Sequence, residues 1–191
     1  KFELGIQLAA SNINLTQNGC TTNDKNDLAK LRWATGNLKS TGSTNYIWAP
    51  SQTEIGYYYA FNKLYNGSTG DPCSKLNTAY YGTGWRTPSK NELEKLSRCT
   101  DKVFTNNGMW FMNKSLGVFL KAGGVRQESG SGTNGATYTD HGCYWTSTIG
   151  TSKNAYNMEF WNTEAHVNNT SSWFGLQTNG LLIRCVKGTK Q

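Results

Sequence analysis

Short apolar runs alternate with long polar connections along the whole of this chain. The connections are rich in Gly, Asn, Ser and Thr, which are typical of turns and loops. The apolar runs CYWTSTI (143–149), AYNMEF (155–160) and LLIRCV (181–186) predict strands. Connections this long are uncommon in a compact domain unless they are functional. The pattern predicts an α+β fold of short antiparallel strands, one or two helices and long loops.

The segment TPSKNELEKLSRC (87–99) carries the clearest helix signal. Thr87 or Ser89 can cap its N-terminus, and Glu92 lies three residues after Ser89, as a capping box requires. Two leucines then fall on one face of the helix. By contrast, TTNDKNDLAKLRWATGNL (21–38) predicts a polar loop followed by a strand and a turn.

Length and composition indicate a single folded domain. The 191 residues suit one domain, 1–191, with residues 1–30 as an N-terminal strand or extension. Aromatic residues make up 13% and charged residues only 16%, whereas disordered chains lack aromatics and are highly charged. Because no run of about 18 apolar residues is present, we expect no transmembrane segment. The chain begins at Lys1 without a signal peptide, and we expect a mature form or a domain of a longer protein.

The net charge of +7 is spread along the chain. No basic cluster is combined with a nucleic-acid-binding motif. We therefore interpret the charge as a solvated surface and expect no nucleic-acid partner. A weak attraction for acidic glycans or nucleic acid is the alternative.

The five cysteines lie far apart with no CxxC pair, which argues against a zinc site. They are Cys20, Cys73, Cys99, Cys143 and Cys185. An odd number allows at most two internal disulfides and leaves one thiol. Disulfides are compatible with secretion, although the cysteine count alone does not establish it.

The two histidines are the natural candidates for catalysis. His141 lies near Asp140 and Cys143, an arrangement that allows a Cys-His nucleophile or a metal site, but the spacing matches no known motif. An ordinary loop histidine is therefore the preferred interpretation. His166 has only Glu164 nearby. We predict no catalytic residues and no cofactor.

A calcium site in the final third of the chain has few candidate ligands. No Asp lies beyond Asp140, so such a site would need Glu159, Glu164 and neutral oxygens. We therefore predict no metal site.

The alternation in AYNMEF separates an inward-facing set of side chains from an outward-facing set. The set expected to face the core is Tyr156, Met158 and Phe160. The set expected to face solvent is Asn157, Glu159 and Trp161. An outward Trp beside an acid and amides is typical of a binding interface. The alternative is a polar surface loop in which Trp161 and Trp173 pack down onto the core.

We predict that the last third of the chain, residues 151–187, contains a ligand-binding surface. The residues expected to contact the ligand are Lys153, Asn154, Asn157, Glu159, Trp161, Asn162, Glu164, His166, Asn168, Asn169, Trp173 and Gln177.

Trp85, Arg86 and Trp145 are expected to be structural. The two tryptophans are large apolar side chains in polar surroundings, and such rings usually anchor a core. Arg86 lies between a Trp and a helix cap, where a guanidinium can bind backbone carbonyls or a carboxylate.

Seven short motifs, taken in order, resemble a known family. They are LRWATGNL (31–38), DPC (71–73), GWRTPSKNELEKL (84–96), GVFLKAGGVR (117–126), GCYWTSTI (142–149), AYNMEF (155–160) and GLLIRCV (180–186). Together they resemble the Fibrobacter succinogenes major paralogous domain group and its bacteroidetal relatives. That group is similar to the C-type lectin-like, formylglycine-generating-enzyme-type fold, which the resemblance implies for this chain.

The resemblance also bears on the cysteines. Cys73 and Cys185 lie in the recurring DPC and RCV motifs, so their pairing is favoured, with Cys99 as a rival partner for Cys185. Enzymes of this fold use a pair of cysteines near the end of the domain. Cys185 is alone in that region here, so the oxidase chemistry is not carried over. The motifs of calcium-dependent sugar-binding lectins are absent as well.

The function that the resemblance implies is binding without catalysis. Related surface adhesin tips and the variable proteins of diversity-generating retroelements hold a changeable C-terminal surface on a fixed scaffold. We therefore expect an extracellular or cell-surface adhesin, at a fimbrial tip or on an outer-membrane lipoprotein. Its partners would be a protein or glycan receptor on another cell, and fimbrial subunits. The alternatives are a glycan-binding module of a secreted carbohydrate-active protein, a phage receptor-binding protein, and a fold-related enzyme with a bound metal.

Overall fold

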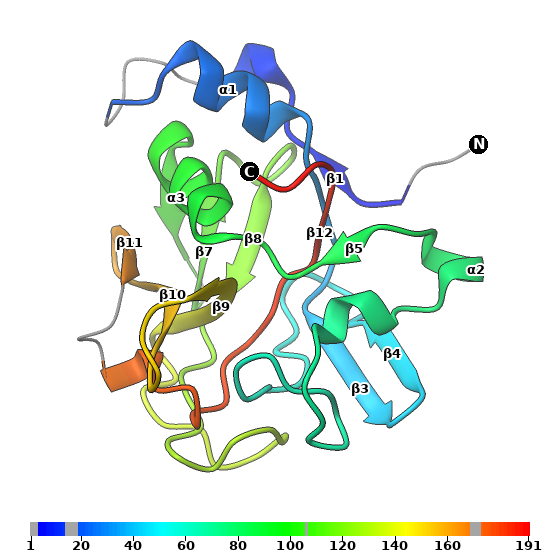
Figure 1. The fold of residues 1–191 in the computed structure, drawn as a ribbon. Coiled ribbons are helices and arrows are strands. Elements are labelled where there is room, and N and C mark those ends of the chain that lie inside the picture. The colour runs from blue at the N-terminus through cyan, green and yellow to red at the C-terminus, as the bar shows by residue number, and fades with distance from the viewer. Residues whose placement is uncertain (1–3, 14–18, 106, 169–172) are drawn as a thin grey trace.

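The computed structural model describes residues 4–13, 19–105, 107–168 and 173–191. It has an α+β architecture of short antiparallel strands and few helices, as the sequence pattern predicts (Figure 1). The helices are α1 (Thr22–Ala29), α2 (Thr78–Tyr81) and α3 (Lys90–Cys99), with 3-10 turns η1 (Ala10–Asn12), η2 (Pro72–Lys75) and η3 (Trp173–Gly175). The strands are β1 (Ile6–Gln7), β2 (Arg32–Trp33), β3 (Leu38–Gly42), β4 (Asn45–Trp48), β5 (Trp85–Arg86), β6 (Lys102–Phe104), β7 (Gly108–Phe111), β8 (Val118–Lys121), β9 (Gly142–Ile149), β10 (Ala155–Trp161), β11 (Glu164–Asn168) and β12 (Val186–Lys187).

The strands pair in small antiparallel sheets. Their orders are β1-β2-β12-β5, β11-β10-β9, β3-β4 and β6-β7-β8. The first sheet joins the N-terminal strand to the last strand of the chain, so both ends of the sequence are built into one sheet. None of the helices in the described ranges is long and apolar enough to cross a lipid bilayer.

Helix α3 begins as the sequence predicts. Ser89 is the N-cap: its hydroxyl accepts a hydrogen bond from the Glu92 amide at 3.2 Å, and the Glu92 carboxylate accepts one from the Ser89 amide at 2.7 Å. This reciprocal pair satisfies two backbone donors that the first turn would otherwise leave free. Leu93 and Leu96 are buried on one face of the helix, as expected.

Helix α1 was not predicted. The sequence indicated a polar loop over its residues, and that prediction is wrong. Thr21 and Asp24 form a second capping box, with two reciprocal hydrogen bonds of 3.1 Å. Leu28 is the only buried residue of this short helix, so the apolar period that would identify it from sequence is missing.

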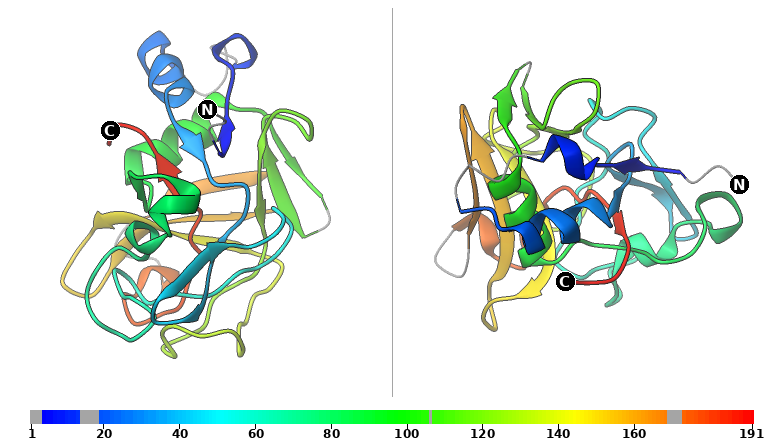
Figure 2. Two further views of the ribbon diagram at one scale, coloured as in Figure 1. Left: turned by 90° about the vertical axis from the view of Figure 1, so that its right-hand side faces the viewer. Right: turned by 90° about the horizontal axis from the view of Figure 1, so that it is seen from above.

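Helix α1 lies across α3 (Figure 2). Two ion pairs join the helices: Lys95 contacts Asp27 at 2.8 Å and Arg98 contacts Asp24 at 3.0 Å. A residue from the segment predicted as an N-terminal extension, Leu8, is fully buried in the same core. The N-terminal residues that the structure describes therefore form part of the domain core.

The interior contains two clusters of buried side chains. One lies between α3 and the β9–β10 strands, and the other is rich in aromatic rings and lies around β4 and β5. Trp85 and Trp145 both belong to the second cluster, as their predicted structural role requires. Arg86 is structural too: its guanidinium binds the buried Glu92 carboxylate through two hydrogen bonds, of 2.8 and 2.5 Å, and the carbonyl of Gly188 at 3.0 Å.

The segment 181–186 is buried but is not one continuous strand, so the strand prediction for LLIRCV is correct only for its end. Leu181 pairs with Tyr59, and Leu182 forms a parallel bridge with Tyr144 of β9. Only at β12 does the chain join a sheet. The segment runs through the middle of the molecule and changes partner almost at each residue, which prevents a regular ladder.

The described cysteines form two disulfides. Cys73 is bonded to Cys185, the pairing that the resemblance favours, and ties η2 to the C-terminal segment. Cys20 is bonded to Cys99 and ties the start of α1 to the end of α3. The rival pairing of Cys99 with Cys185 is therefore excluded. Cys143 is a buried free thiol.

Candidate functional site

The β9–β10–β11 sheet separates two faces in the last third of the chain. Met158 and Phe160 of β10 point toward α3 and are fully buried in the core, as predicted. Asn157, Glu159 and Trp161 lie on the opposite face, so the predicted period of two is correct up to this point.

Two of the three side chains on that opposite face do not reach solvent. Asn157 is 0% exposed and Glu159 is 7% exposed, so the prediction that they face solvent and contact a ligand is wrong. Asn154, another predicted ligand contact, is also buried. Tyr156, predicted to face the core, is only half-buried beneath the ammonium of Lys90.

These side chains are buried because the turn η3 covers this face of the sheet. Gly175 lies so close to β10 that a β-carbon there would be 2.9 Å from the Ala155 carbonyl oxygen and 3.2 Å from the Asn157 side-chain oxygen. Asn179 holds the turn in place by donating hydrogen bonds to the carbonyls of Trp173, at 3.0 Å, and Phe174, at 3.2 Å. Several of the asparagines therefore support the surface from below.

Five aromatic side chains gather at the end of this sheet. They are Tyr138, His141, Trp161, Trp173 and Phe174, and we call them the aromatic face. The rings of His141 and Trp161 are stacked, with centroids 5.0 Å apart and planes 12° apart. Tyr138 contacts Trp173 at 5.8 Å and Phe174 at 5.5 Å, edge to face. Each ring thus packs against another ring of the face.

The aromatic face exposes a large apolar area. Tyr138 is 52% exposed, and Trp161 and Trp173 are each 42% exposed. The predicted alternative, in which both tryptophans pack down onto the core, therefore does not describe this surface. A group of large rings held half in water is typical of a binding surface.

Two carboxylates lie beside His141, whose ring stacks on Trp161. The Nδ1 atom of His141 lies 3.4 Å from the Glu159 carboxylate, which also accepts a hydrogen bond of 2.9 Å from the Asn168 amide. Asp140 lies on the other side of the imidazole, 3.9 Å from its Nε2 atom. Glu159 is therefore buried beside His141 and is not one of the exposed side chains of the aromatic face.

The loop that carries Tyr138 and His141 depends on a double glycine. The amides of Gly123 and Gly124 both donate to the His141 carbonyl, at 3.0 and 2.8 Å. Gly124 has φ of +68°, and a β-carbon there would lie 1.9 Å from the Thr137 carbonyl oxygen. Only glycine fits this close approach, which sets the loop against the sheet.

The remaining predicted contacts fall in three places. Asn162 and Glu164 lie at the exposed β10–β11 turn, with Glu164 paired across the strands with Trp161. His166 contacts Glu164 at 3.1 Å and, with Asn168, lines a polar hollow between β11 and α3. Asn169 lies outside the described residues.

Lys153 and Gln177 do not belong to the aromatic face. They line a separate open hollow of about 490 Å³ beside Phe61, Lys63 and Glu128. Gln177 donates a hydrogen bond of 2.9 Å to the carbonyl of Thr151. The predicted surface is therefore divided, because this hollow contains no residue of the aromatic face.

Sequence reasoning missed three members of the aromatic face. Tyr138 and Phe174 were not singled out, and His141 was interpreted as an ordinary loop residue. The available signal was the grouping of Tyr138, Asp140 and His141 in a long Gly-rich loop. Contact between that loop and Trp161 depends on sheet pairing, which the local sequence does not specify.

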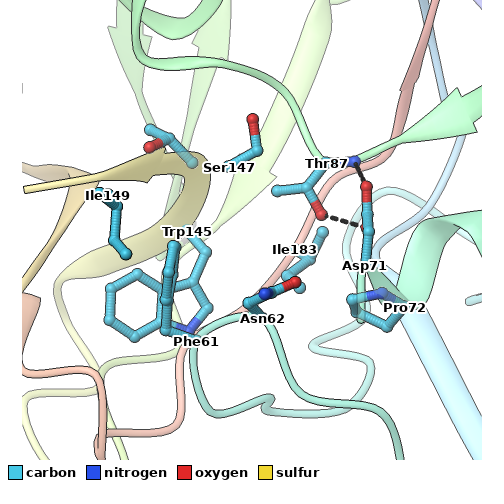
Figure 3. Close-up of a pocket in the computed structure, with 10 residues that line it drawn as sticks. Phe61, Asn62, Asp71, Pro72, Thr87, Trp145, Ser147, Ile149 and Ile183 are labelled. Carbon is cyan, nitrogen blue, oxygen red and sulfur yellow. Dashed lines mark hydrogen bonds between the residues drawn. The ribbon is translucent and has the colours of Figure 1, made fainter. Parts of the chain in front are cut away.

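A cavity of about 160 Å³ lies beside β9 (Figure 3). Its Asp71 carboxylate accepts hydrogen bonds from the Thr87 amide at 2.8 Å, the Thr87 hydroxyl at 2.7 Å and the Cys73 amide at 3.0 Å. The Trp145 ring nitrogen donates to the Tyr59 carbonyl at 2.6 Å. These hydrogen bonds join η2 to the residue that follows β5, and β9 to the segment containing Tyr59.

One group of possible metal ligands occurs among the described residues, at Cys20, Asp24 and Cys99. Its two sulfurs are joined in a disulfide, so neither is a thiolate. The one free thiol, Cys143, is buried, and burial raises its pKa well above the ordinary value. A raised pKa disfavours the thiolate that a nucleophile or metal ligand would need.

Comparison with models of protein families, with curated proteins and with solved structures finds no match for this chain.

Proposed function

We propose that this protein is a non-enzymatic, surface-displayed binding domain with a C-type lectin-like fold, which recognises a protein or glycan through the aromatic face. The observation that carries the proposal is the exposure of Tyr138, Trp161 and Trp173 side by side. Burying such rings would stabilise the fold, so their exposure calls for another role. Aromatic side chains dominate binding hot spots because they combine large area with few rotatable bonds.

The rigidity of the aromatic face supports the same proposal. Trp161 is stacked on His141, and the Glu159 carboxylate lies 3.4 Å from the Nδ1 atom of His141. A surface whose rings are already in place loses little conformational entropy when a ligand binds. The free thiol that lies near Glu159, Cys143, is buried and its pKa is raised, which disfavours the thiolate that a nucleophile would need.

The resemblance noted for the sequence motifs extends the proposal to cellular context. We propose an extracellular or cell-surface adhesin, at a fimbrial tip or on a lipoprotein, with a receptor on another cell as its partner. The two disulfides fit an oxidising compartment. A retroelement-diversified C-terminal surface is part of the proposal, since Trp161, Asn162, Glu164 and Trp173 are exposed on a fixed framework.

The proposal is tested by replacing the two tryptophans singly. We expect Trp161→Ala and Trp173→Ala to weaken binding by at least about tenfold, on a glycan array and in cell-surface pull-downs. Melting temperature and circular dichroism should stay close to those of the wild type, because neither ring belongs to a buried cluster.

The matched control is Tyr80→Ala. Tyr80 is an exposed ring on α2, at the opposite side of the molecule from η3 (Figure 1). The Tyr80→Ala variant should therefore bind as tightly as the wild type. Normal binding by both tryptophan variants would contradict the proposal.

Diversification has its own test in the neighbouring DNA. A near-identical repeat of the last part of the coding sequence, differing only at adenines and lying beside a reverse transcriptase gene, is the expected result. Its absence would leave an adhesin with an ordinary fixed surface.

A further inference from the structure

The charge around the aromatic face has the opposite sign to that of the whole protein. The chain carries a net charge of +7, with histidine counted as neutral, yet residues 127–183 contain a single Lys or Arg, Lys153. The acidic side chains in the same range are Glu128, Asp140, Glu159 and Glu164. The exposed rings therefore lie in a locally acidic part of a basic molecule.

Two of these carboxylates are available to a ligand. The side chains of Asp140 and Glu164 are 78% and 64% exposed. Asp140 precedes His141, whose ring supports Trp161, and Glu164 lies directly opposite Trp161 across the β10–β11 pair. The carboxylates thus flank the exposed indole from two elements of the fold.

Basic groups from the neighbouring elements do not neutralise this surface. Arg98 of α3 lines the hollow beside His166, but its guanidinium is paired with Asp24 at 3.0 Å. Lys153 lines the separate hollow beside Phe61. Among the described residues of the 127–183 range, the other side chains that can become positively charged are His141 and His166, and each already lies against a carboxylate.

We infer that the aromatic face binds an arginine- or lysine-bearing segment of a protein partner, an inference that rests on the proposed function. A guanidinium stacks on an indole or phenol ring and pairs with a carboxylate, so Trp161 with Asp140 and Glu164 offers both interactions to one side chain. An anionic glycan would meet two exposed carboxylates at the same place and be repelled.

The test uses an array of random dodecapeptides probed with the labelled domain. We expect the bound peptides to be enriched in Arg and Lys. The double variant Asp140→Asn/Glu164→Gln should bind those peptides at least about tenfold more weakly, because a charge-assisted hydrogen bond is lost on each side of the ring. It should keep the wild-type melting temperature, since both side chains are exposed.

The matched control is Glu54→Gln/Asp101→Asn, which makes the same change in net charge at residues outside the aromatic face and outside the β9–β10–β11 sheet. Equal weakening by the control would show that overall charge, not the face, is responsible, and would overturn the inference. Peptide binding that depends on Trp161 without Arg or Lys enrichment would overturn the inference and leave the proposed function intact. If the domain binds no peptide but binds a glycan array in a Trp161-dependent way, the inference is likewise overturned and the proposed function is left intact. Failure on both arrays would count against both proposals.

Discussion

Asn157 shows that an asparagine in this segment can lie in the buried framework beneath the surface instead of at the surface itself. Its side chain is fully buried under Gly175, and neither its amide nitrogen nor its carbonyl oxygen has a hydrogen-bond partner among the described residues. Asn162, five residues later, is exposed in the β10–β11 turn with φ of +56°. The two asparagines look alike in sequence but occupy very different environments.

This difference leads to a prediction from two isosteric substitutions. Asn157→Asp places a carboxylate in a buried site close to Glu159, and we expect it to lower the free energy of unfolding by about 3 kcal/mol or more. Asn162→Asp is the control, and we expect a change within about 0.5 kcal/mol, because Asp tolerates this backbone conformation at the surface. Urea unfolding of both variants measures the two values. Equal, small effects would show that Asn157 is solvated.

For these single residues, the sequence correctly predicted which side chains share a face of the strand. It did not predict which of them are exposed to solvent. The pattern of AYNMEF placed Met158 and Phe160 on one face and Asn157 and Glu159 on the other, as the structure does. What covers the second face is η3, and its contact with β10 depends on Gly175 and on a buried Asn179. Neither contact leaves a periodic signal in the sequence.

Single elements differ in how well the sequence defines them. Helix α3 combines a capping box with two leucines on one face, and both signals were needed to predict it. Helix α1 has an equally good capping box at Thr21 and Asp24 but buries only Leu28. It is joined to α3 by two ion pairs and by the Cys20–Cys99 disulfide, which are long-range contacts that the local sequence does not reveal.

The turn η3 and the loop carrying Tyr138 show why the candidate site was predicted only in part. Trp161 and Trp173 were identified from their polar surroundings, which is a local property. Tyr138 and His141 join them because Gly123 and Gly124 bring a distant loop against the sheet. The motif containing these glycines was noticed, but its role in building the aromatic face required the fold.

The whole molecule is held together around buried tyrosines, which gives a prediction about alkaline pH. Burial raises the pKa of Tyr58 to about 12 and raises the pKa values of Tyr59 and Tyr144 further. In an unfolded chain these phenols ionise near pH 10. Above about pH 10 the unfolded state therefore binds fewer protons than the folded state, and the free energy of unfolding falls as pH rises.

Two basic groups act in the opposite direction. Burial lowers the pKa of Arg184 to about 10 and also lowers the pKa of Lys102, so both lose a proton more readily in the folded state. The three tyrosines outweigh these two groups, and we expect stability to fall between about pH 10 and pH 12. The phenolate absorbance of the three tyrosines should rise together with the loss of circular dichroism. Their full ionisation in a folded protein would contradict this account of the core.

Radical footprinting of the whole domain tests the claim that the aromatic face is the binding surface. The domain is labelled alone and with its strongest binder from the arrays, and modification is measured at Tyr138, Trp161 and Trp173. Binding should protect all three, while the exposed Tyr80 on α2 and Ile149 beside the cavity of Figure 3 are labelled as before. Unchanged labelling of the three rings, with protection at Tyr80 or Ile149, would place the binding surface elsewhere and contradict the claim.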